Sequence, residues 1–192
     1  QLGRMTALAA RSAGYRVHAL DPDPKCSIRP LVEDFIAADW NDVEAAAALA
    51  QSSQVVTFEI EKVSIASLEG AARHAPVRPG PAVLHLIQNR LRQKLWLSRT
   101  GFPVGAFRPV ANLEDLRNAS RDLGPCFVKV AEGGYDGRGQ IRLASPSEAD
   151  SACAAATTSN IVIHHTRRGC MATAPEWRTR RRRGCRRRAS AA

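Results

Sequence analysis

A glycine-rich segment between two short apolar runs constrains this chain more than any other feature. The segment spans residues 129–140 and reads KVAEGGYDGRGQ. Cys126–Val128 leads into it and Gln140–Leu143 leaves it, so the pattern predicts a β-hairpin. Glycines let backbone N–H groups approach an anion closely, and Lys129 and Arg138 add positive charge. The residues alone leave two interpretations open, a phosphate-binding loop and a plain hairpin turn.

Two common nucleotide-binding motifs do not fit this segment. A P-loop and a dinucleotide fingerprint both open a helix, whereas a predicted strand follows the loop here. Asp21 follows Gly3 by about the spacing at which a Rossmann acid meets a ribose. Asp21 also begins the run Asp21–Pro24, whose Asp-Pro pairs form turns. Both interpretations of Asp21 stay open, and the turn is favoured.

The first hundred residues alternate helices and strands, as in an α/β domain. Gly14 is expected to end the first helix and Asn41 to cap the second. Ligands in open α/β sheets bind beyond the carboxyl ends of strands, where Glu59 stands, although a solvated strand end explains this acid equally well. Arg90 and Lys94 lie four residues apart, so they share a helix face, and from the residues alone such a basic pair is usually a solvated surface. The predicted helices are residues 2–12, 42–51, 65–74 and 81–99, and the predicted strands are residues 15–20, 35–38 and 55–58, the last of them buried and parallel.

The sequence after residue 100 predicts a smaller set of helices and strands around the hairpin. A strand is expected at residues 106–110 and a helix at residues 113–123, capped by Asn112. Another helix begins near Ser145, and Ile161–Ile163 has the composition of one further strand.

The basic character of the chain lies at its carboxyl end. The net charge is +10, but residues 161–192 hold ten arginines and a single acid, Glu176. Such an arm would bind RNA or DNA through phosphates without sequence preference. A disordered tail and a shift of reading frame between about residues 145 and 161 are the alternatives. No run is long and apolar enough for a membrane span, and five cysteines without a C-x-x-C pair favour a reducing cytoplasm.

Four motifs in order resemble the 5-(carboxyamino)imidazole ribonucleotide synthase family of the ATP-grasp superfamily. They are QLGRM at residues 1–5, TFEIE at residues 57–61, NRLRQK at residues 89–94 and the segment at residues 129–140. The resemblance covers about residues 1–150. It implies a Rossmann-like pre-ATP-grasp domain at residues 1–100, with a strand and glycines expected before Gln1. It also implies a truncated ATP-grasp small lobe at residues 101–156, which leaves residues 157–192 as the tail.

The resemblance implies ATP-dependent carboxylation of 5-aminoimidazole ribonucleotide with bicarbonate, in the synthesis of IMP, by a cytoplasmic homodimer. Carboxyphosphate would be the intermediate. The implied contacts to the ribonucleotide are Gln1, Leu2, Glu59 and Tyr135. The implied ATP-binding residues are Arg90, Lys129, Gly134, Tyr135, Asp136, Gly137, Arg138, Gly139 and Gln140.

The sequence departs from the family pattern in two places. Asn89 stands where the family has Asp, which removes a charge and weakens any ion pair expected there. The strand after the helix at Ser145 lacks the family's acids, and no acid cluster follows Asp150 to hold Mg²⁺. We therefore expect no turnover by this chain alone. The alternatives are another ATP-grasp carboxylate–amine ligase, a binding module that uses the basic tail, and a Rossmann oxidoreductase.

Overall fold

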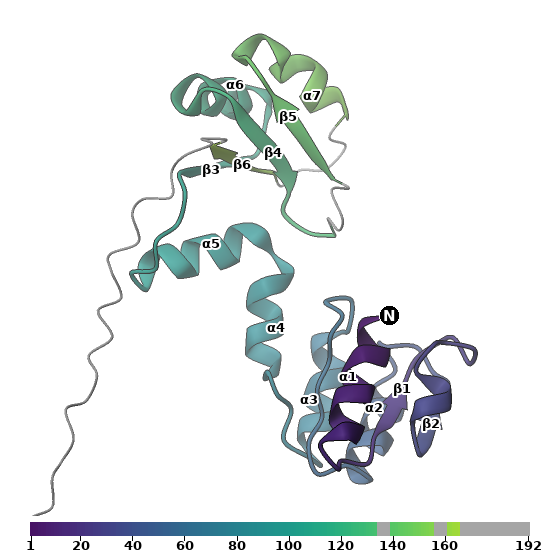
Figure 1. Ribbon diagram of the computed structural model, residues 1–192. Coiled ribbons are helices and arrows are strands. Elements are labelled where there is room, and N and C mark those ends of the chain that lie inside the picture. Colours follow the sequence, from purple (N-terminus) through teal and green to yellow (C-terminus); the bar gives the residue numbers. More distant parts are fainter. Residues whose placement is uncertain (134–138, 156–160, 166–192) are drawn as a thin grey trace, which may run out of the picture.

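The chain folds into two lobes with separate hydrophobic cores, which two consecutive helices join (Figure 1). The computed structural model describes residues 1–133, 139–155 and 161–165. The tip of the glycine-rich segment, residues 134–138, and residues 166–192 lie outside the described part. No helix in that described part is long and apolar enough to cross a membrane.

The first lobe combines short parallel strands with three helices. β1 and β2 pair in parallel, and Val56 forms a single parallel bridge with Val77. Leu68, Val77 and Leu84 lie at the centre of its core, each no more than 4% exposed. The elements are α1 (Leu2–Ser12), β1 (His18–Leu20), η1 (Arg29–Leu31), β2 (Asp34–Ile36), α2 (Val43–Gln51) and α3 (Ile65–Ala72).

Two sequence predictions for this lobe are wrong. Asp42, not Asn41, caps α2, because the Asp42 carboxylate accepts the Ala45 N–H at 3.0 Å. Residues 55–58 form no strand beyond the bridge at Val56, and Val55 is 56% exposed. An apolar run becomes a strand only where neighbours pair along it, and here one residue finds a partner. The end of α1 is as predicted, since Gly14 follows the helix with φ of 86°.

The predicted single helix at residues 81–99 is two helices, α4 (Pro81–Gln88) and α5 (Arg90–Arg99). Asn89 lies between them in an extended conformation, with φ of −119° and ψ of 113°. Its side-chain oxygen accepts the Arg92 N–H at 2.9 Å and caps α5. The apolar spacing runs through the break, so periodicity alone could not reveal it. The two helices point in different directions between the lobes (Figure 1).

The second lobe is an antiparallel sheet of order β3-β6-β4-β5 with two helices. The predicted hairpin is confirmed, because β4 pairs with β5 and Lys129 lies opposite Gln140. Asn112 caps α6 as predicted, by accepting the Asp115 N–H at 2.9 Å. The elements are β3 (Phe107–Val110), α6 (Leu113–Leu123), β4 (Cys126–Val130), β5 (Gln140–Leu143), η2 (Pro146–Glu148), α7 (Ala149–Ala155) and β6 (Ile161–His165).

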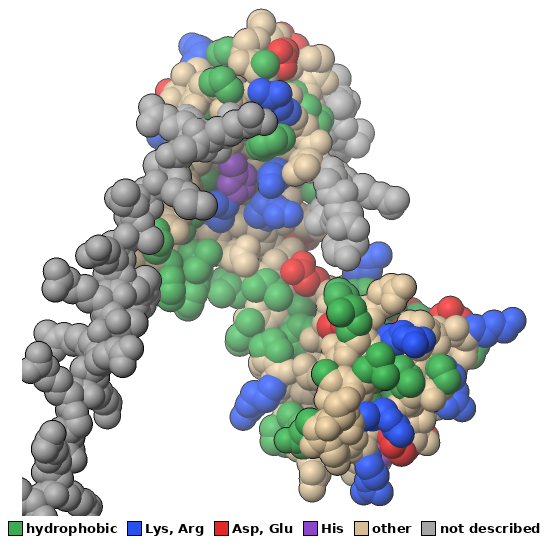
Figure 2. All heavy atoms as spheres, viewed as in Figure 1, with side chains coloured by type: hydrophobic (Ala, Val, Ile, Leu, Met, Phe, Trp, Pro, Cys, Tyr) green, Lys and Arg blue, Asp and Glu red, His purple; other side chains and the backbone are tan. Residues whose placement is uncertain are grey.

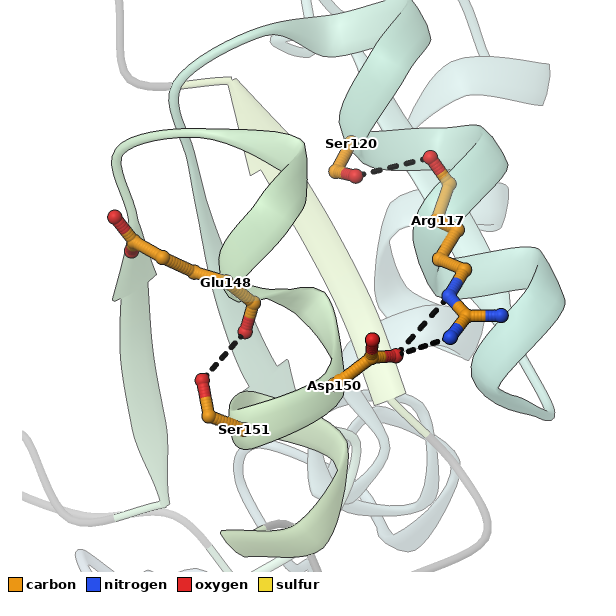
Figure 3. Close-up of polar contacts among 5 residues, drawn as sticks. All are labelled: Arg117, Ser120, Glu148, Asp150 and Ser151. Atoms are coloured by element: carbon orange, nitrogen blue, oxygen red, sulfur yellow. Dashed lines mark hydrogen bonds and ion pairs between the residues drawn. The ribbon is translucent and has the colours of Figure 1, made fainter.

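Helices α6 and α7 cover one face of this sheet. Leu116 and Ala152 from the helices pack with Val128 and Ile163 from the strands. At the outer side of the two helices, Arg117 of α6 points to Asp150 of α7, and two of its nitrogens donate to one carboxylate oxygen at 2.6 and 3.0 Å (Figure 3). Both side chains are exposed, so this ion pair adds about 1 kcal/mol or less.

Strand β6 extends the second lobe beyond residue 156, the limit that the sequence predicted. It lies between β3 and β4, and the side chains of Val162 and Ile163 are fully buried. Residues 161–165 therefore belong to the sheet and not to a tail. The strand predicted at Ile161–Ile163 is confirmed, but charge statistics placed it in the tail, because the arginines that follow dominate the local composition.

Candidate functional site

Basic side chains from both the connecting helices and the sheet converge where α5 meets the second lobe. Arg90 and Lys94 come from α5, Lys129 from β4, and His164 from β6. Burial, followed by the charges of Lys129 and Arg90, lowers the pKa of Lys94. Burial, followed by the charges of Lys94, Lys129 and Arg90, lowers the pKa of His164 to about 4. We call these four residues the basic cluster.

The pairing of the strands explains how the basic cluster forms. His164 lies opposite Phe107 on one side and Phe127 on the other, so the three rings share one face of the sheet. Lys129 follows Phe127 by two residues and joins the same face, with its Nζ 5.8 Å from the centre of the Phe127 ring. The Nζ of Lys94 lies 5.5 Å from the centre of the Phe107 ring. This face is opposite the one that α6 and α7 cover.

The cluster carries polar atoms that its own surroundings leave without partners. Among the described residues, the buried Arg90 Nε and His164 Nε2 have no hydrogen-bond partner. Figure 2 shows Lys and Arg side chains beside a histidine on the second lobe, on the side of the connecting helices. Like charges repel, and a buried donor without a partner, such as Arg90 Nε, costs free energy, so an anion such as a phosphate would stabilise this arrangement.

The structure brings together two of the residues predicted to bind ATP and adds two more. Arg90 and Lys129 are in the basic cluster. Gly139 and Gln140 lie at the base of the hairpin, where the Gly139 oxygen accepts the Val130 N–H at 2.9 Å.

Lys94 and His164 were not among the predicted site residues. The spacing of Arg90 and Lys94 was a usable signal for Lys94, whereas nothing local marks His164. The predicted contacts Gly134, Tyr135, Asp136, Gly137 and Arg138 lie outside the described residues.

A second group of predicted site residues lies at the start of α1, on the side of the first lobe that faces the second (Figure 1). The Glu59 carboxylate lies against the first turn, since a Cβ added to Gly3 would stand 2.6 Å from Glu59 Oε1. Partial burial of this carboxylate raises the pKa of Glu59, and the amino group of Gln1 opposes that effect. Gln1, Leu2 and Glu59 are therefore neighbours.

The geometry favours the turn interpretation of Asp21. Its carboxylate accepts the Asp23 N–H at 2.9 Å, and the Asp23 carboxylate accepts the Lys25 N–H at 2.8 Å. Asp21 thus caps a turn at the end of β1, as Asp commonly does.

A metal site formed by protein side chains alone is absent from the part of the chain that the structure describes. No group of three or more His, Cys, Asp or Glu side chains comes together there. Mg²⁺ takes oxygen ligands in octahedral geometry, usually one or two carboxylates together with substrate phosphates and water, so the described residues offer no cluster that would hold this ion without a nucleotide.

Comparison with known proteins decides the family. Residues 1–88 match the ribonucleotide synthetase preATP-grasp domain family, and residues 95–166 match the ATP-grasp domain family. An N5-carboxyaminoimidazole ribonucleotide synthase from Staphylococcus epidermidis is 37% identical over 153 residues, which cover 79% of this chain and 41% of that protein. The chain belongs to the N5-carboxyaminoimidazole ribonucleotide synthase family. The α/β fold that the sequence predicted, a pre-ATP-grasp domain followed by part of an ATP-grasp domain, is confirmed.

Solved structures of this family share the fold. The ADP complex of an N5-carboxyaminoimidazole ribonucleotide synthetase is 35% identical with a TM-score of 0.78, over 85% of this chain and 44% of that one. The enzyme from Aspergillus clavatus, in complex with ADP and 5-aminoimidazole ribonucleotide, is 27% identical with a TM-score of 0.70, over 85% and 43% of the two chains. The chain thus spans about two fifths of the length of its N5-carboxyaminoimidazole ribonucleotide synthase relatives.

Replacing Gly3 with Ala tests the contact between α1 and Glu59. The new Cβ would displace Glu59 Oε1, which is the end of a flexible side chain, so the carboxylate moves towards water. We expect the raised pKa of Glu59 to return towards its ordinary value. Ala favours a helix over Gly by about 1 kcal/mol, so the variant should be no less stable than the wild type. A carboxyl titration followed by NMR measures the pKa, and an unchanged value would contradict the contact.

Proposed function

We propose that this chain forms the ATP-binding part of an enzyme that carboxylates 5-aminoimidazole ribonucleotide in purine synthesis. The observation that carries the proposal is the basic cluster, in which Arg90 and Lys94 from α5 meet Lys129 and His164 from the sheet. Membership of the N5-carboxyaminoimidazole ribonucleotide synthase family names the reaction, and the structures with bound ADP show that relatives take an adenine nucleotide.

Charge neutralisation is the main task of the residues that would hold ATP. Phosphoryl transfer needs positioned positive charge and little covalent help from the protein. Lys129 would neutralise the α- and β-phosphates, and Arg90 would reach them from α5. Lys94 would add a third cation on the same side. Backbone N–H groups of residues 134–140, together with Arg138, would cover the phosphates.

The ribonucleotide would bind at the start of α1. The first turn of a helix presents free N–H groups to an anion, and Glu59 offers an acceptor beside them. Gln1 and Leu2 would line this site, and Tyr135 and Asp136 would approach it from the hairpin. An oxygen of bicarbonate would attack the γ-phosphorus of ATP and release ADP. The exocyclic amine of the ribonucleotide would then attack the carbon of carboxyphosphate and release phosphate.

We further propose that the 192-residue chain alone does not complete this reaction. Mg²⁺ would neutralise the transferred phosphoryl group, and its ligands are not gathered within the described residues. A homodimer in the cytoplasm is the assembly and location that the family resemblance implies. An assay for ATP- and bicarbonate-dependent consumption of 5-aminoimidazole ribonucleotide should show no turnover by this chain, and measurable turnover would contradict this proposal.

Lys129→Ala tests nucleotide binding directly. Removing one positive charge from the cluster should weaken ADP binding about tenfold, because a charge-assisted contact to phosphate contributes about 1.5 kcal/mol. Isothermal titration calorimetry measures the dissociation constant. Lys25→Ala is the control, since it removes the same charge from an exposed turn after β1. Equal affinities of the Lys129 variant, the Lys25 variant and the wild type would argue against the proposed site.

A further inference from the structure

We propose that Asn89 is a positioning residue that fixes Arg90 beside Lys129 by tying the start of α5 to the end of β4. The inference rests on the proposed function, because nucleotide binding is what the positioning serves. Asn89 lies at the junction between α4 and α5, where the first lobe passes to the second. A residue at this junction decides how cations on α5 lie relative to cations on the sheet.

Three hydrogen bonds fix this junction: the first caps α5, and the other two connect it to the chain after β4. The Asn89 oxygen Oδ1 accepts the Arg92 N–H at 2.9 Å. Its nitrogen Nδ2 donates to Glu132 Oε1 at 2.8 Å. The backbone N–H of the next residue, Arg90, donates to the Ala131 oxygen at 2.8 Å. Two successive residues of the junction therefore bind two successive residues of the chain just after β4.

Each end of the connection lies next to a member of the basic cluster. Arg90 is a member of the cluster, and Lys129, another member, precedes the buried Ala131 by two residues. Glu132 also leads directly into Gly133, which has φ of 73°. A shift of α5 along β4 would break these bonds and separate Arg90 from Lys129. The same bonds thus hold two phosphate-binding side chains in register.

The amide side chain at residue 89 suits this role, and a carboxylate would not. Asn and Asp cap helices about equally well, so capping alone does not distinguish them. Only Asn has a donor for the Glu132 carboxylate, whereas Asp would place two carboxylates face to face. From the sequence, Asn89 was expected to weaken an ion pair, because it lacks the charge of Asp. In this chain Glu132 supplies a carboxylate, and the neutral amide of Asn89 donates a hydrogen bond to it.

Asn89→Asp separates positioning from helix capping. The variant keeps an acceptor for the Arg92 N–H but repels Glu132, so we expect ADP affinity to fall about threefold at pH 8. Facing carboxylates share a proton as the pH falls, so the ratio to wild type should approach one at pH 5. A residue with only a structural role would give a ratio that does not depend on pH.

The double variant Asn89→Asp with Glu132→Gln provides the rescue. The new amide at position 132 would donate to the new carboxylate at position 89, which reverses the direction of the native bond, and affinity should return to within about twofold of wild type. Glu132→Gln alone keeps an acceptor oxygen and serves as the matched control. Unchanged affinity in Asn89→Asp, or a double variant no better than the single one, would overturn the proposal.

Hydrogen exchange distinguishes failure of this inference from failure of the proposed function. The Arg90 N–H is bonded to Ala131, so its protection reports on the connection without any nucleotide. Protection should fall about threefold in Asn89→Asp and recover in the double variant. If the wild type binds no ADP but these exchange rates behave as stated, the proposed function fails and the connection stands. If protection is the same in all variants, the connection is wrong.

Discussion

Between pH 7 and pH 5, the wild-type chain should lose about 1.5 kcal/mol more free energy of unfolding than a His164→Gln variant. The pKa of His164 is about 4 in the folded chain, below the ordinary value of 6.5. The unfolded chain therefore takes up a proton below pH 6.5, while the folded chain stays neutral there until about pH 4. Stability from this residue is complete above pH 6.5 and is lost as the pH falls towards 4. A fall in pKa from 6.5 to about 4 would by itself give a difference of just under 2 kcal/mol between pH 7 and pH 5, and solvent screening reduces this to about 1.5 kcal/mol.

Urea denaturation at pH 7, 6 and 5 measures this difference. His74→Gln is the control, because His74 is exposed in the first lobe and lies outside the basic cluster. It should keep the pH dependence of the wild type. If His164→Gln and wild type lose stability in parallel, then His164 is not buried beside the charges of Lys94, Lys129 and Arg90 as the structure has it.

The hairpin and the helix α6 could be predicted because their signals are local. Apolar runs flank the glycines directly, and Asn112 stands next to the helix that it caps. Such signals depend on residues that are neighbours in the sequence, so no knowledge of the rest of the fold is needed. The four family motifs also made the order of the two domains predictable.

The misjudged elements depend on partners that are distant in the sequence. Residues 55–58 have the composition of a strand but pair only at Val56, with a residue at position 77. The break at Asn89 is fixed by Glu132 and Ala131, which come more than forty residues later. His164 enters the site because β6 inserts between β3 and β4, which composition could not show.

Gly139→Ala should lower the free energy of unfolding of the second lobe by about 3 kcal/mol. Gly139 has φ of 70°, where a residue with a side chain costs about 1–2 kcal/mol. A Cβ there would also stand 2.5 Å from Val130 Cγ2, and Val130 cannot turn away freely because it is β-branched. The Val130 N–H donates to the Gly139 oxygen at 2.9 Å, so the crowding falls on the bond that closes the hairpin.

Gly133→Ala separates the two causes, since Gly133 has φ of 73° but nothing within 4 Å of an added Cβ. The free energy of unfolding of that variant should fall only by the cost of the backbone conformation, about 1–2 kcal/mol. Adding Val130→Ala to Gly139→Ala should relieve the crowding, so the double variant loses less than the two single losses together. Urea denaturation measures the free energy of unfolding of the wild type and of all four variants, which include Val130→Ala alone. Two results together would contradict the close approach of Gly139 to Val130. Gly133→Ala and Gly139→Ala would lose equal free energies of unfolding, and the loss in the double variant would equal the sum of the losses in Gly139→Ala and Val130→Ala. The backbone conformation alone would then explain the cost of Gly139→Ala.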